Sequence, residues 1–84
     1  MTPSRQFAES VKYTARPIIL IPASSGEIVI MEAFGARREY ICTLPPAELA
    51  RWAKEDFARQ TSLQKEAMRP KIPNLDLDKL DFIL

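Results

Sequence analysis

Histidine is absent from this 84-residue sequence, and cysteine occurs only once, as Cys42. Histidine is the commonest general base and the commonest metal ligand, so its absence excludes the conventional histidine-based catalytic and zinc sites. A single cysteine excludes an intramolecular disulfide and favours a reducing compartment. We therefore expect a protein that is not an enzyme and that carries no metal or other cofactor.

Long apolar segments are also missing. No run approaches the ~20 residues that a transmembrane helix requires, and residues 1–10 show no signal-peptide pattern. We expect a cytoplasmic protein that does not enter a membrane. The 12 basic and 11 acidic residues leave a formal net charge of +1, which argues against phosphate neutralisation as the main activity.

The residues that are present predict one small α+β domain over 1–84. Hydrophobic residues make up 46% of the chain and charged residues 27%, as in ordinary globular proteins. Apolar segments separated by turn residues predict strands at about 17–22, 27–34 and 37–44. Because the intervening turns are short, these strands are expected to form an antiparallel meander.

The segment before these strands is open to two interpretations. Thr2 and Pro3 are typical of the cap and first position of a helix. Residues 10–15, however, alternate apolar and polar side chains of β-branched and aromatic type. We favour a fourth strand over 10–15.

A change of period at Pro45 and Pro46 predicts one long helix over about 46–68, in the C-terminal half of the chain. Its apolar arc comprises Leu49, Trp52, Ala53, Phe57, Leu63, Ala67 and Met68. Three polar residues, Asp56, Gln60 and Gln64, fall inside this arc, so its second half is expected to be less buried. The apolar tail, 70–84, is expected to fold back as a strand or a short helix.

Both faces of the predicted sheet are aliphatic, because segments 18–21 and 28–31 direct alternate apolar side chains to opposite sides. One helix covers only one face. Each aliphatic side chain left in water forfeits about 1.5–3 kcal/mol. We therefore expect the tail or a second copy of the chain to cover the other face, and a homodimer is our working interpretation.

Several residues could be assigned a function, but a structural role explains each of them more simply. Without a histidine to activate it, Cys42 is expected to be a small apolar strand residue rather than a nucleophile. Trp52 and Phe57 fit core packing better than interface anchors. The tail carboxylates Asp76, Asp78 and Asp81 lack the order and glycine of a calcium loop and fit a polar face.

The basic residues and the polar residues of the helix are the candidates for partner contacts. Arg37 and Arg38, together with Lys65, Arg69 and Lys71, suggest a basic patch, although Glu39 interrupts it and a solvated surface is the simpler interpretation. The candidate partner-binding residues are Arg37, Arg38, Asp56, Gln60, Gln64 and Arg69.

From these observations we expect a non-catalytic protein-binding module that occupies a surface of a larger protein or ribonucleoprotein complex. Small inhibitors from phages and mobile elements, anti-CRISPR proteins among them, share its general form, which is the only basis for that comparison. The alternative is a small nucleic-acid-binding regulator that uses Arg37, Arg38 and the basic end of the helix. Binding that weakens steeply with salt would favour the alternative.

Overall fold

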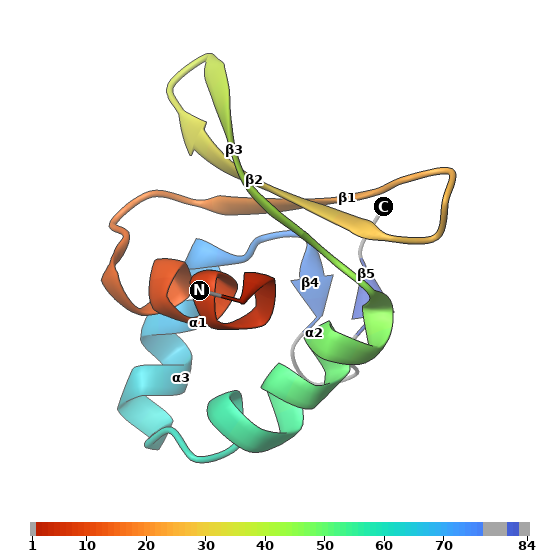
Figure 1. The fold of residues 1–84 in the computed structure, drawn as a ribbon. Helices are drawn as coiled ribbons and strands as arrows, with labels where there is room; N and C mark the ends of the chain where they lie inside the picture. The colour runs from red at the N-terminus through yellow and green to blue at the C-terminus, as the bar shows by residue number, and fades with distance from the viewer. Residues whose placement is uncertain (1, 77–80, 83–84) are drawn as a thin grey trace.

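A three-stranded antiparallel sheet forms one layer of the protein, and helices pack against one of its sides (Figure 1). The computed structural model describes residues 2–76 and 81–82. The strands are β1 (Ile18–Pro22), β2 (Ile28–Phe34) and β3 (Arg37–Leu44), in the order β1–β2–β3. The α+β class and the antiparallel meander predicted from the sequence are confirmed.

Two turns and one bulge shape the meander. Gly26 and Gly35 lie in the turns with φ of 91° and 63°, a backbone region that side chains with a Cβ rarely adopt. Between β2 and β3, Ile30 pairs with Cys42 while Met31 pairs with Tyr40, so Ile41 is the extra residue of a β-bulge.

The strand predicted over 10–15 is wrong, because residues 10–13 belong to the helix α1 (Pro3–Tyr13) and Thr14 is its C-cap. Thr2 caps the helix by accepting a hydrogen bond from the Arg5 N–H at 3.3 Å, and a proline follows at its first position. Phe7 and Val11, four residues apart, are both fully buried. The packing of this helical face outweighs a short alternating pattern.

The single long helix predicted over 46–68 is also wrong. The chain forms α2 (Pro46–Trp52), continues as the π-helix η1 (Ala53–Phe57), turns, and starts again as α3 (Ser62–Met68). In a regular α-helix, at about 100° per residue, Trp52 and Phe57 would point about 140° apart. The wider π-turn brings their rings to a centroid distance of 5.8 Å, and both side chains are buried.

A capping box explains why α3 is a separate helix. The Gln64 N–H donates to the Thr61 hydroxyl at 3.2 Å, and the Gln64 side-chain oxygen accepts from the Thr61 N–H at 3.0 Å. None of the side chains of α3 is fully buried, and Leu63 is 82% exposed. The apolar arc predicted for this region is therefore interrupted after Phe57, and beyond it Met68 packs against the core while Leu63 does not.

The described part of the tail returns to the core. After the 3₁₀ turn η2 (Arg69–Lys71), Ile72 and Leu75 are buried. Short strands β4 (Leu75–Asp76) and β5 (Asp81–Phe82) pair with each other. The predicted tail residues 77–80 and 83–84 lie outside the described residues.

One hydrophobic core holds these elements together on the helical side of the sheet. Phe7 of α1 packs edge-on against Trp52 of α2, with ring centroids 5.0 Å apart. The sheet contributes the buried side chains Ile18, Leu20, Ile28, Ile30, Cys42 and Leu44. The core thus uses one face of the sheet, and the other face lies outside it.

Candidate protein-binding surface

The side of the sheet opposite the helices is largely aliphatic. We define this outer face by the residues that alternate with the core positions: Ile19, Ile21, Val29, Met31, Tyr40 and Thr43. Ile21 is 43% and Tyr40 is 62% exposed, while Ile19, Val29 and Met31 are half-buried. Figure 1 shows α1, α2 and α3 on the opposite side, so none of these helices covers the outer face.

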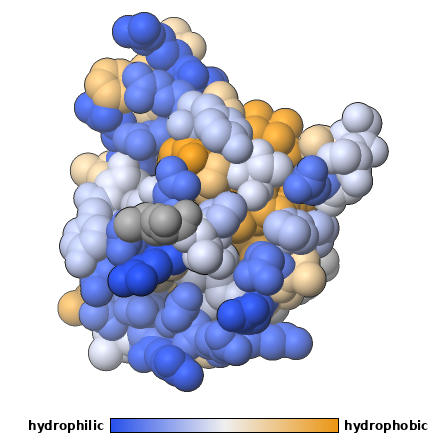
Figure 2. Space-filling view, in the orientation of Figure 1, coloured by the Kyte–Doolittle hydropathy of each residue, from blue (hydrophilic) through white to orange (hydrophobic). Residues whose placement is uncertain are grey.

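Strand pairing brings the members of the outer face into one patch. Met31 lies between Ile19 on β1 and Tyr40 on β3, and Val29 lies between Ile21 and Thr43. The Tyr40 and Thr43 hydroxyls are 2.7 Å apart, which aligns the Tyr40 ring along β3. Figure 2 shows hydrophobic residues gathered between the two projecting ends of the sheet. A contiguous exposed apolar patch is typical of an interaction site.

The hairpin end of β3 carries the rim of this patch. Arg37, Arg38 and Glu39 are all exposed. The Arg38 guanidinium donates to the carbonyl oxygens of Gly35 at 3.2 Å and Arg37 at 3.0 Å. Among the described residues nothing pairs with the Arg37 guanidinium. Two of the predicted partner-binding residues therefore lie next to the outer face.

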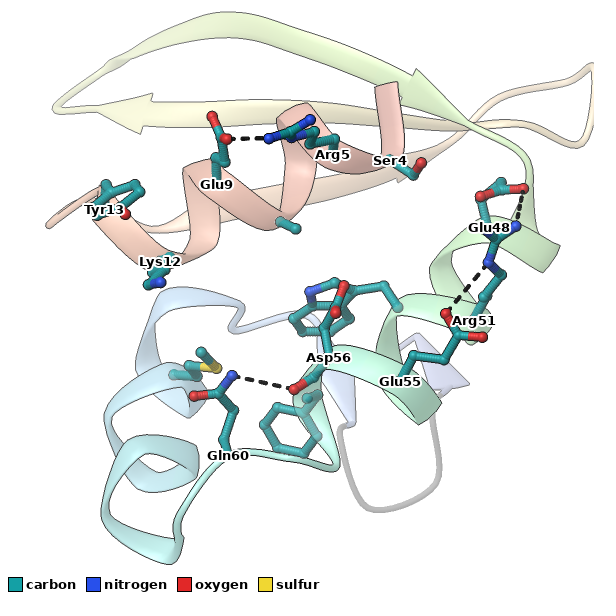
Figure 3. A pocket seen from close by; sticks show the side chains of 14 residues that line it. Ser4, Arg5, Glu9, Lys12, Tyr13, Glu48, Arg51, Glu55, Asp56 and Gln60 are labelled. Atoms are coloured by element: carbon teal, nitrogen blue, oxygen red, sulfur yellow. Dashed lines mark hydrogen bonds and ion pairs between the residues drawn. The ribbon is translucent and has the colours of Figure 1, made fainter. Parts of the chain in front are cut away.

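Apart from the outer face, a hollow lies between α1 and the α2–η1 segment (Figure 3). Its volume is about 450 Å³, and Ala8, Trp52, Phe57 and Met68 supply its apolar lining. Charged side chains of both signs surround it. Arg51 lies 3.5 Å from both Glu48 and Glu55, and Arg5 lies 3.7 Å from Glu9. Such exposed pairs contribute little binding energy, and their mixture selects no ligand charge.

The three polar residues predicted as a mixed-polarity contact are not together. Asp56 and Gln60 line the hollow, where the Gln60 amide donates to the Asp56 backbone oxygen at 3.2 Å. Gln64 instead serves in the capping box of α3. The hollow therefore contains two of these three residues.

The predicted basic patch is divided between two places. Arg37 and Arg38 lie on the β2–β3 hairpin, whereas Arg69 lies after α3 and pairs with Glu66 at 3.1 Å. Figure 1 shows the hairpin projecting beyond the helices, whereas α3 and the turn that follows it lie on the helical side of the sheet. Lys71 donates to the Val11 backbone oxygen at 3.4 Å, so its charge is used within the fold. A nucleic acid would meet two separated clusters instead of one stripe.

Cys42 is on the inner face of the sheet and is only 4% exposed. Burial raises the pKa of its thiol, which therefore stays protonated at neutral pH. A buried, protonated thiol is a poor nucleophile, which agrees with the apolar strand role predicted for it. No helix in the described ranges has the length and apolar character to cross a membrane.

No family model matches the chain, and comparisons with curated proteins and with solved structures also give no match. Its own geometry is therefore the basis for a functional assignment. The apolar residues of the outer face were not among the predicted site residues. The signal for them was present in the alternation of segments 18–21 and 28–31, which predicted two aliphatic faces.

Proposed function

We propose that this chain is a non-catalytic protein-binding domain that docks a larger protein on the outer face of its sheet. The observation that carries the proposal is the aliphatic patch that the helices leave uncovered, with Ile21 and Tyr40 most exposed. Occupying a surface of a larger complex is also how a small inhibitor would act.

Burial of this patch by a partner would contribute measurably to the free energy of binding. Full burial of one aliphatic side chain is worth about 1.5–3 kcal/mol, so the exposed 43% of Ile21 corresponds to about 1 kcal/mol. Several such side chains lie side by side, and each 1.4 kcal/mol changes affinity about tenfold. Arg37 and Arg38 at the rim favour a partner with acidic residues beside an apolar ridge.

A matched pair of variants tests the proposal. Ile21→Glu places a charge in the outer face, and Leu63→Glu makes the same change at an exposed residue of α3, away from the face. Affinity capture from a lysate of the encoding organism is followed by titration calorimetry with the purified partner. We expect wild type and Leu63→Glu to bind one partner equally and Ile21→Glu to bind it at least about tenfold more weakly.

The other outcomes count against the proposal. Equal binding by all three proteins, or no partner for the wild type, would place the function elsewhere. A wild-type dimer in light scattering that Ile21→Glu converts to a monomer would show that a second copy occupies the face. Capture of nucleic acid that weakens steeply with salt would favour the regulator alternative.

A further inference from the structure

The two edges of the sheet are protected to very different degrees. At the β1 edge, the Asn74 side chain bonds both backbone groups of Leu20: its oxygen accepts from the N–H at 3.1 Å, and its amide donates to the carbonyl. Pro22, which follows Leu20 on the same edge, has no N–H to offer. The Asn74 side chain and Pro22 thus leave little of the β1 edge for another strand.

The β3 edge lacks this protection between Arg37 and Tyr40. The Ala33 N–H donates to the Pro17 oxygen at 2.9 Å, so Ala33 bonds toward β1. Arg38, its neighbour on β3, therefore belongs to a pair without ladder hydrogen bonds and points its own N–H and carbonyl outward. The described contact that covers this edge, from the Gln6 amide to the Ile41 oxygen at 3.0 Å, lies beyond Tyr40.

The open part of the β3 edge is accessible in space. Arg37, Arg38, Glu39 and Tyr40 are all exposed. Figure 1 shows the β2–β3 hairpin projecting beyond the helices, so nothing described there blocks an approaching chain. An unpaired strand edge of this kind is a template for an added strand.

We propose that β3 receives an extended, acidic segment of the partner as a fourth strand of the sheet; this inference rests on the protein-binding function proposed above. The backbone of the segment bonds the outward groups of Arg38. Alternate side chains then continue the outer face beside Tyr40, and acidic side chains face Arg37 and Arg38.

Charge favours an acidic segment over a second copy of this chain as the added strand. Antiparallel self-pairing centred on Glu39 places Glu39 opposite its own copy. Pairing centred on Arg38 places Arg38 opposite its own copy, and only the flanking Arg37–Glu39 pairs offset that repulsion. Like charges directly opposite each other destabilise a strand pair. A segment with acidic residues opposite Arg37 and Arg38 and an uncharged residue opposite Glu39 has neither conflict.

A display library of random ten-residue peptides tests this inference on the full chain. Arg38→Pro removes the outward N–H but leaves the β2–β3 hydrogen bonds in place, because Arg38 makes none of them. Arg38→Thr keeps the N–H and removes the charge. We expect selected peptides to be acidic with alternating apolar residues, to lose at least about tenfold in affinity on Arg38→Pro, and to lose less on Arg38→Thr, with reduced salt dependence.

Resynthesis of a selected peptide with N-methyl groups on alternate residues gives the same test without changing the protein. We expect methylation in one register to abolish binding and in the other to be tolerated. Basic or helical peptides, equal binding to Arg38→Pro, or a library that yields no binder would overturn the inference. An Arg38-dependent dimer in light scattering would identify the occupant as a second copy and would overturn it too. If the strand-addition test fails but Ile21→Glu still abolishes partner binding, the protein-binding function stands and the outer face binds its partner through side chains alone.

Discussion

The Asn74 contact with β1 makes a measurable contribution to stability, and its loss in Asn74→Ala can be estimated. The change leaves the N–H and carbonyl of Leu20 without their partners in a half-buried position. A buried backbone group that loses its hydrogen bond costs about 1–3 kcal/mol, and partial access of water favours the lower end. Two groups give a loss of about 2 kcal/mol in the free energy of unfolding.

That loss is a large fraction of the whole. A chain of 84 residues has a total stability of about 4–13 kcal/mol, at about 0.05–0.15 kcal/mol per residue. With about 4–8 °C per kcal/mol for a domain of this size, the midpoint of thermal unfolding is expected to fall by about 8–16 °C. Urea unfolding followed by the fluorescence of Trp52, the only tryptophan and a buried one, measures the effect.

Gln6→Ala is the matched control for Asn74→Ala. Its side-chain amide also bonds a sheet edge, at Ile41, but it makes one hydrogen bond and is exposed, so water replaces it. We expect a loss below about 1 kcal/mol. Equal losses for the two variants, or a loss below about 0.5 kcal/mol for Asn74→Ala, would refute the reasoning that the β1 edge depends on this amide.

Two further predictions concern Cys42 and α3. Burial raises the pKa of the Cys42 thiol, so the unfolded chain ionises first: stability is complete below the unfolded pKa of about 8.5 and is lost as pH rises toward the folded pKa. Urea unfolding between pH 7 and 10 should show this decline in wild type and a flatter profile in Cys42→Ala. Thr61→Ala removes the capping box, which costs α3 about 1 kcal/mol of local stability. We expect faster amide exchange in Ser62–Met68, while the urea midpoint followed by Trp52 fluorescence stays nearly unchanged. A large loss in the free energy of global unfolding would show that α3 unfolds only with the core.

The strands could be predicted because their signals are local. Apolar runs in β1 and β2 stand between prolines and glycines, and Gly35 marks a two-residue connection to β3. The uncovered aliphatic face follows from the same alternation. The bulge at Ile41 could not be predicted, because it depends on how β3 meets its neighbour and not on β3 alone.

The helical regions were harder because tertiary contacts decided them. The segment over 10–15 has a strand-like pattern, but burial of Phe7 and Val11 in the core, with Phe7 against Trp52, favours a helix. Between Trp52 and Phe57 the sequence carries no proline or glycine, so it gave no reason to expect a π-helix. The π-helix lets the Trp52 and Phe57 rings enter the same core, and this requirement is visible only once the fold is known.

The open β3 edge and the outer face adjoin each other, and both are exposed in the isolated chain. An exposed edge and an exposed apolar patch both invite unwanted association. The hairpin that carries the edge is nevertheless held in place: the Arg16 guanidinium lies 3.3 Å from the Phe34 ring centroid and 3.4 Å from the Glu32 carboxylate. A pre-organised edge loses less conformational entropy on binding. Because Asn74 closes the opposite edge, one partner that adds a strand at β3 and rests on the outer face would cover both exposed features at once.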